Sequence, residues 1–144
     1  VGAAITAALS YTAGSLGTLN ITDYADNASS TLNTTITDNN ATGITNAIAV
    51  SESEIVEAVQ IKINIAHNWI GDVGIELVSP AGTRSVLFTP YSGFFNADNM
   101  VNFILTSNAF YGEETDGNWT LRVIDGSAGY TGTLTNWSIR FYEH

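Results

Sequence analysis

The sequence NWTLRV at residues 118–123 returns as NWSIRF at residues 136–141, with a residue of similar character at each changed position. In both copies the apolar residues are Trp, then Leu or Ile, then Val or Phe, and they alternate with polar residues. A period of two is typical of a β-strand with one buried face. The arginines fall on the opposite phase, so their aliphatic stems lie over a solvated sheet face. We therefore expect both copies to be strands of the scaffold.

The same alternation continues through the chain from residue 47 onward. It predicts further strands at residues 48–50, 55–67, 73–77, 86–88 and 101–105. Turn sequences such as Ser79-Pro80-Ala81-Gly82 separate them, with proline and glycine at positions that turns favour. Short strands with regularly spaced turns, and no amphipathic helix, are typical of all-β folds. We predict a jelly-roll β-sandwich of about eight strands.

The chain before residue 47 has a different composition. Residues 10–46 are rich in Gly, Ser, Thr and Asn and contain only isolated apolar residues, which predicts a loop or linker. Residues 1–9 are rich in alanine and long enough for two turns of helix. They lack the basic start and the length of a signal peptide.

Length, cysteine content and charge exclude several classes. A chain of 144 residues suits one domain, and the absence of cysteine excludes disulfides and thiolate metal sites. Fourteen acidic residues against four Lys and Arg give a net charge of -10, which argues against nucleic acid as a partner. No apolar run approaches the ~20 residues of a membrane span. The charge is compatible with bound calcium or with solubility in salt.

The sequence contains no recognisable catalytic motif. A serine protease needs a nucleophile beside a base that a carboxylate orients, and the Gly-Thr-Ser-x-Ala motif of subtilisins is absent. His67 ends a strand on its buried phase, where we expect a hydrogen-bonded structural imidazole. Asp72, across a turn, is a candidate partner that would fix the loop. We predict that the chain is not an enzyme.

Four acidic residues are candidate calcium ligands: Asp38, Asp72, Asp98 and Glu113. Each lies in a separate predicted loop next to Gly or Asn. Calcium takes about six to eight oxygen ligands, which loops between rigid elements commonly supply. The hypothesis is a site at one end of the sandwich. A structural alternative stays open for each residue: Asp72 caps a turn, Asp38 forms an Asx-turn, and Glu113 pairs with a strand arginine.

Aromatic residues also gather in the predicted loops, with Phe94-Phe95 as the clearest case. Such rings either fill the core beneath a long loop or contact a neighbouring domain. Stacking on a sugar is the third alternative.

The sequence HNWIGDVGIELVSPAGT at residues 67–83 resembles the signature of the P domain, also called Homo B. This domain follows the catalytic domain in kexin- and furin-like proprotein convertases and in many bacterial subtilisin-like proteases. Further similar segments keep the family's order: DNN at residues 38–40, YGE at 111–113, GNWTL at 117–121 and GTL at 132–134. The resemblance covers about residues 36–142. It implies an eight-stranded jelly roll.

The resemblance also implies a domain organisation and a function. Residues 1–35 would be a linker or the remnant of a preceding catalytic domain, and residues 36–144 the P domain. The family's role implies a non-catalytic domain of a secreted subtilisin-like serine protease. It would pack beside the catalytic domain in cis, stabilise and regulate it, and tune its calcium dependence; the protein substrate is a further candidate partner. The alternative from another class is a free-standing carbohydrate-binding or adhesive jelly-roll module.

Overall fold

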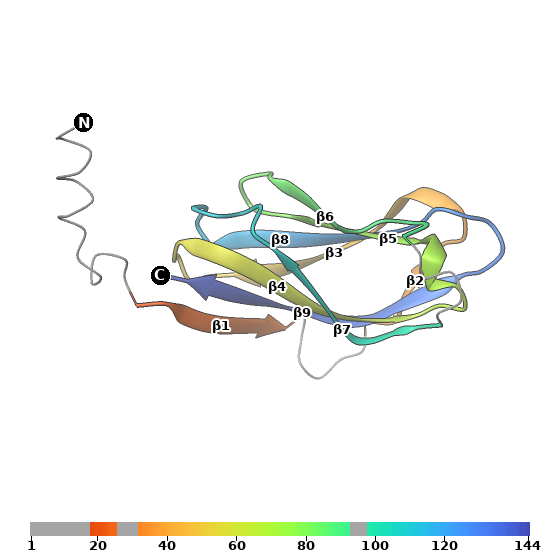
Figure 1. The fold of residues 1–144 in the computed structure, drawn as a ribbon, viewed down its shortest axis with the longest axis horizontal. Helices are drawn as coiled ribbons and strands as arrows, with labels where there is room; N and C mark the ends of the chain where they lie inside the picture. Colours follow the sequence, from red (N-terminus) through yellow and green to blue (C-terminus); the bar gives the residue numbers. More distant parts are fainter. Residues whose placement is uncertain (1–17, 26–31, 93–97) are drawn as a thin grey trace, which may run out of the picture.

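In the computed structural model, which describes residues 18–25, 32–92 and 98–144, the alternating segments form two antiparallel sheets packed face to face (Figure 1). Sheet A has the order β1-β9-β4-β7, and β2 also pairs with β9. Its strands are β1 (Asn20–Ala25), β2 (Thr34–Ile36), β4 (Val56–Ala66), β7 (Met100–Ser107) and β9 (Gly132–Glu143). Sheet B has the order β3-β8-β5-β6. Its strands are β3 (Asn40–Val50), β5 (Val73–Val78), β6 (Arg84–Phe88) and β8 (Gly117–Asp125). A short 3-10 helix, η1 (Ile70–Asp72), precedes β5.

Strands β2 to β9 form a jelly roll. Without β1, the two sheets have the orders β2-β9-β4-β7 and β3-β8-β5-β6. Two facing sheets built from eight strands are the jelly-roll arrangement, so the predicted fold class is confirmed. β1 adds a ninth described strand, which pairs with residues 138–143 of β9. Asn20, the first residue of β1, pairs with Glu143 in the last strand.

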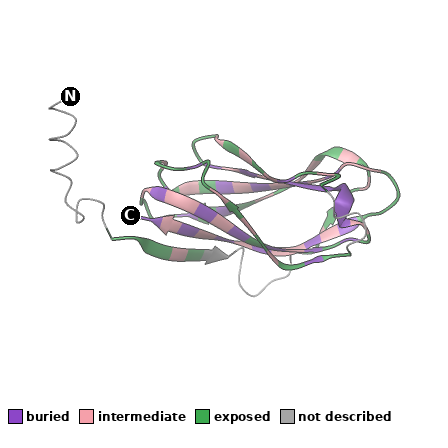
Figure 2. Cartoon of the chain, viewed as in Figure 1, coloured by how far each residue is buried: buried purple, intermediate pink, exposed green. Residues whose placement is uncertain are grey.

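The two copies of the repeated hexapeptide lie in the central strands β8 and β9, one in each sheet. Trp119 and Trp137 are both buried between the sheets, and Figure 2 shows the alternation of buried and exposed positions along these strands. The Trp119 ring packs edge to face against Phe110 and Phe141, with centroids 5.0 Å apart in each pair. The Trp137 indole N–H donates to Oδ1 of Asn46, on the opposite sheet, at 2.7 Å. The prediction that both copies are scaffold is confirmed.

The prediction of a loop or linker over residues 10–46 is wrong where the structure describes this segment. Residues 20–25, 34–36 and 40–46 are strand. β1, β2 and β3 each pair with one neighbouring strand in their sheet, so they need few apolar residues, and their threonines favour extended backbone. Residues 1–9, where a helix was expected, and Phe94-Phe95 lie outside the described residues. The predicted domain boundary between residues 35 and 36 stays a prediction.

Truncating either buried indole tests the assignment of the inner faces. We expect Trp119→Ala and Trp137→Ala each to lower the free energy of unfolding by about 3–5 kcal/mol, because each leaves a large cavity in the core. Urea denaturation followed by circular dichroism measures this. Val101 is 73% exposed, so Val101→Ala is a control that should stay within about 0.5 kcal/mol of the parent chain. If the tryptophan variants lost as little unfolding free energy as Val101→Ala, the assignment of inner and outer sheet faces would be reversed.

Candidate functional site

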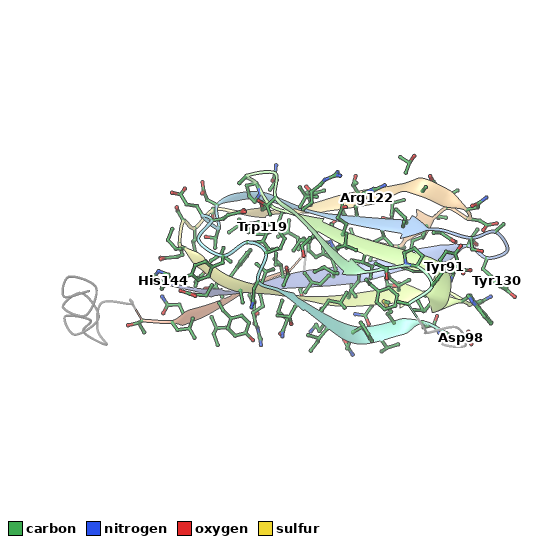
Figure 3. The ribbon with its side chains drawn as sticks, turned by 45° about the horizontal axis from the view of Figure 1, so that its top comes forward. Tyr91, Asp98, Trp119, Arg122, Tyr130 and His144 are labelled. Atoms are coloured by element: carbon green, nitrogen blue, oxygen red, sulfur yellow. The ribbon has the colours of Figure 1, made fainter. Side chains whose placement is uncertain are left out.

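The loops of the sandwich gather at two opposite ends. We call the loops at residues 37–39, 67–72, 89–92, 98–99 and 126–131 the Asp72 end. The loops at residues 51–55, 79–83 and 108–116, together with His144, form the Glu113 end. Figure 3 shows Tyr91, Asp98 and Tyr130 near the first end and His144 near the second.

A fully buried hydrogen bond between a histidine and a carboxylate lies at the Asp72 end. His67, just after β4, places Nε2 3.1 Å from Oδ2 of Asp125, the last residue of β8, and both side chains are 0% exposed. The main-chain N–H of Trp69 donates to Nδ1 of His67 at 3.0 Å, so the ring proton lies on Nε2 and is donated to Asp125. Oδ1 of Asp125 accepts the main-chain N–H of Ser127 at 3.0 Å. The pair therefore ties the start of one loop to the start of another.

This geometry settles the role expected for His67. Both ring nitrogens have partners and the side chain is closed off from solvent, so neither nitrogen is left for a nucleophile. The imidazole is structural. Its expected partner, Asp72, was wrong: the acceptor is Asp125, from a strand far along the sequence.

Asp72 lies close to the same pair but in a different electrostatic environment. It is only 6% exposed. Burial, reinforced by the negative charges of Asp125 and Asp38 and partly opposed by His67, raises the pKa of the Asp72 carboxyl above its ordinary 3.8. The folded state thus binds this proton more tightly than the unfolded state. The resulting stabilisation is complete below pH 3.8 and is lost as the pH rises through the raised pKa.

The loops around Asp72 are held by main-chain contacts. The Tyr91 N–H donates to the carbonyl of Gly71 at 2.6 Å, and the Gly126 N–H donates to the carbonyl of Asp72 at 2.8 Å. The Tyr91 hydroxyl donates to the carbonyl of Gly126 at 2.9 Å. Gly132 packs directly on the imidazole, because a Cβ there would lie 2.4 Å from Cδ2 of His67. This end is therefore a tightly connected set of loops.

The structure places three of the four predicted calcium ligands at this end and one at the other. Asp38 accepts the Gly129 N–H with both carboxylate oxygens, at 2.9 and 3.2 Å. Asp98 is exposed, beside Asn99, whose side chain accepts the main-chain N–H of His67.

Glu113 lies at the opposite end. Its carbonyl accepts the N–H of Val56 at 2.9 Å, and its buried Oε2 has no hydrogen-bond partner among the described residues. The four residues therefore do not form one site. No group of three His, Asp or Glu residues in the described ranges is arranged to hold a metal ion.

Asp125 was missed by the sequence analysis. The available signal was the sequence Asp125-Gly126-Ser127, which places an acidic residue and a turn just after the strand predicted at residues 118–123. An acidic residue in that position accepts main-chain N–H groups of the turn, as Asp125 does from Ser127.

The two facing sheets and the buried His67–Asp125 pair define a β-sandwich domain. Residues 56–141, from the start of β4 into β9, match the family profile of the proprotein convertase P-domain. The chain belongs to this family. The resemblance found in the sequence is thereby confirmed.

Individual relatives agree with this assignment. The Aeromonas extracellular serine protease of Aeromonas sobria is 40% identical over 86 residues, which cover 51% of this chain and 14% of the relative. Proprotein convertase subtilisin/kexin type 6 of Rattus norvegicus is 34% identical over 109 residues, covering 70% of this chain and 12% of the relative. The chain thus spans a small part of the length of these proteases. It is homologous to their accessory P domain.

A solved structure extends the similarity to the whole fold. The crystal structure of the Aeromonas sobria serine protease with the chaperone ORF2 matches with a TM-score of 0.78 at 26% identity. The match covers 98% of this chain and 29% of that chain. No helix in the ranges described for this chain is long and apolar enough to cross a membrane.

Breaking the buried pair tests its structural role. Asp125→Ala leaves the His67 Nε2–H and the Ser127 N–H without their acceptor, and we expect a loss of about 3–5 kcal/mol in unfolding free energy. Asp23→Ala is the control, because it removes an exposed ion pair with Arg140 at 2.6 Å that solvent screens. Urea denaturation of both variants gives the comparison. Equal losses would contradict a structural role for the buried pair.

Proposed function

We propose that this chain is the non-catalytic P domain that follows the catalytic domain of a secreted subtilisin-like serine protease, and that it stabilises and regulates that domain. The observation that carries the proposal is the match of residues 56–141 to the proprotein convertase P-domain. The similarity to a segment of the Aeromonas sobria protease also supports it. That relative is an extracellular serine protease, which supports a location outside the cytoplasm.

Stabilisation by such a domain has a simple physical basis. A linked domain is present at a high effective concentration and binds only the folded form of its neighbour. If the effective concentration is about 100 times the dissociation constant of the two docked domains, the unfolding free energy of the neighbouring domain rises by about 2.7 kcal/mol. The rigid jelly roll offers a preformed surface, so little conformational entropy is lost on docking.

The test compares the two-domain protein with a version that ends at residue 17. The in-frame coding sequence upstream of Val1 should encode a catalytic domain with Asp, His and Ser. Removing residues 18–144 should lower the melting temperature of that domain by about 5–10 °C, and peptidase activity should decay faster on heating. The isolated chain should cleave no peptide. An unchanged melting temperature would contradict the proposal that this domain stabilises the catalytic domain. An upstream sequence without the three residues would contradict the proposal that a serine protease domain precedes this chain.

We also propose that calcium binds at the Asp72 end, held by the two carboxylates of Asp38 and Asp72. The support is chemical: the donors are carboxylate oxygens, which calcium prefers. Burial and neighbouring carboxylates raise the pKa of Asp72, and a bound cation would offset that unfavourable charge. Main-chain carbonyls and water would complete the oxygen shell. Glu113 is not part of this proposal, because it lies at the other end.

A chelator tests the calcium proposal. Adding EGTA to the purified chain should lower its melting temperature by several degrees, because calcium binds the folded state. Asp72→Asn should remove this effect of EGTA, and Glu113→Gln should keep it. Thermal unfolding followed by circular dichroism is the measurement. The same melting temperature with and without EGTA counts against bound calcium. If Glu113→Gln removed the effect of EGTA and Asp72→Asn kept it, the calcium site would lie at the Glu113 end instead.

The rival function, a carbohydrate-binding module, has one observation in its favour. Tyr91 and Tyr130 are 59% and 45% exposed at the same end of the sandwich, and exposed rings stack on sugars. A screen against soluble and insoluble polysaccharides separates the two functions. Binding that Tyr91→Ala and Tyr130→Ala abolish would favour the rival.

A further inference from the structure

Half of the acidic residues of the chain lie at or next to the Glu113 end of the sandwich. These seven of the fourteen are Glu52, Glu54, Glu57, Glu113, Glu114, Asp116 and Glu143. The loops at residues 51–55, 79–83 and 108–116 contain no Lys or Arg. The basic residue at this end is His144, whose Nδ1 lies 2.7 Å from Oε1 of Glu57. This end therefore has a large excess of negative charge.

The arginines of the chain are engaged away from this end. Nη2 of Arg84 and Nη1 of Arg122 lie 3.6 and 3.7 Å from Oε1 of Glu76, on sheet B. Arg140 pairs with an aspartate of β1 at 2.6 Å. The remaining cation, Lys62, belongs to the middle of β4. The charge of the Glu113 end is thus not balanced by the Lys and Arg residues of this chain.

Main-chain pairing brings the acidic residues together in space. Ile55 and His144 exchange two N–H to carbonyl hydrogen bonds of 3.0 Å, and Ile55 also forms a β-bridge with Glu114. The next residue, Val56, pairs with Glu143 on one side and donates its N–H to the carbonyl of Glu113 on the other at 2.9 Å. The start of β4 therefore lies between the end of β9 and residues 113–114.

Two of these carboxylates have a buried oxygen without a donor. Glu143 is 2% exposed, and its Oε1 accepts the hydroxyl of Thr22. Oε2 of Glu143 and Oε2 of Glu113 are buried and have no hydrogen-bond partner among the described residues. Both residues are neighbours of Val56, and paired residues of adjacent strands point to the same face. A buried carboxylate oxygen without a donor is unfavourable, so a positive charge brought to this end would stabilise it.

The polypeptide enters the domain at this same end. Asn20, at the start of β1, pairs with Glu143, and Figure 1 shows the start of β1 beside the C-terminus. A domain joined to the chain before residue 18 is therefore tethered next to the Glu113 end, and its effective concentration is highest there.

Exposed apolar side chains accompany the charge. Leu19 and Ile21, at the point of entry, are 58% and 57% exposed, and Tyr111, in the loop at residues 108–116, is 67% exposed. Apolar and aromatic residues with a polar surround are typical of protein interfaces. The face of a tyrosine ring also attracts the guanidinium group of an arginine.

We propose that the Glu113 end is the surface on which the preceding catalytic domain docks, and that this domain presents a patch of lysine and arginine side chains to the carboxylates. The point at which the polypeptide enters identifies the partner, and charge complementarity identifies the chemistry of its surface. The inference rests on the proposed function for the presence of that catalytic domain.

Protection of single cysteines tests the location of the interface. The chain has no cysteine of its own, so Tyr111→Cys and Tyr130→Cys each add one thiol, at exposed tyrosines of opposite ends. Maleimide labelling of that residue, followed by peptide mass spectrometry, is compared between the two-domain protein and the isolated chain. Labelling of Tyr111→Cys should be at least about tenfold slower in the two-domain protein. Tyr130→Cys is the control and should react equally fast in both.

A pair of charge variants tests the chemistry. Glu54→Gln/Glu114→Gln removes two exposed carboxylates at the Glu113 end, and Ala128→Lys/Thr131→Lys changes the net charge equally at exposed positions of the other end. In the two-domain protein the glutamine variant should lower the melting temperature of the catalytic domain by about 2–4 °C. The lysine variant should leave it unchanged. The difference between the glutamine variant and the parent protein should shrink in about 0.5 M NaCl, because salt screens exposed charges.

Three results would overturn the inference: equal labelling of Tyr111→Cys in the two proteins, protection of Tyr130→Cys instead, or equal melting temperatures of the two charge variants. Circular dichroism of the isolated variants reports whether each is folded, and Glu114→Cys replaces Tyr111→Cys if that variant is not.

The proposed function fails separately from this inference. If Tyr111→Cys is protected but removing residues 18–144 does not destabilise the catalytic domain, the docking surface stands and the stabilising role is wrong. If this removal destabilises the catalytic domain while Tyr111→Cys stays fully reactive, the stabilising role stands and the surface is wrong.

Discussion

The packing of two inner sheet faces against each other, centred on Trp119 and Trp137, is the contact on which the rest of this structure depends. The two indoles come from the central strands of different sheets. Each satisfies its N–H with an oxygen of the protein, Trp119 through the carbonyl of Thr115 and Trp137 through Asn46. Both indole rings are thus buried with their one polar group, the N–H, hydrogen-bonded. With the sheets fixed in this way, the loops at both ends have rigid supports.

The buried pair of His67 and Asp125 extends this rigidity to the Asp72 end. It joins a loop that leaves sheet A to a loop that leaves sheet B. Because the imidazole is neutral and donates to a carboxylate that also accepts a main-chain N–H, the buried charge has two hydrogen bonds. A histidine in this setting holds loops in place, which agrees with membership of a family of accessory domains.

The sequence predicted those parts of the fold in which burial alone decides the pattern. Strands β4, β5, β8 and β9 have a clean alternation of apolar and polar residues, and the structure follows it. β1 and β2 were missed because strands with a single neighbour need few apolar residues, and because each pairs with residues of β9 that lie far away in the sequence, such as Asn20 with Glu143 and Thr34 with Leu134.

The site was less predictable because contacts between loops depend on how the strands are connected and not on the local sequence. Whether a loop carboxylate lies at one end or the other depends on how many strands separate the loops, so Asp38 and Asp72 came together while Glu113 did not. The partner of His67 was wrong because a residue 58 positions away, rather than the local Asp72, completes the hydrogen bond. Local spacing indicates which residues are polar loop residues. Only the topology decides which of them meet.

The pairing of Asn20 with Glu143 has a consequence for how this unit fits into larger proteins. The first described strand and the last strand lie side by side, so the start of β1 and the end of β9 are at the same place on the domain surface. A unit with this geometry can be added to the end of a host, or inserted within one of its exposed loops, without forcing the host's own ends apart. The jelly roll is therefore a module that shuffling between genes can move as one piece.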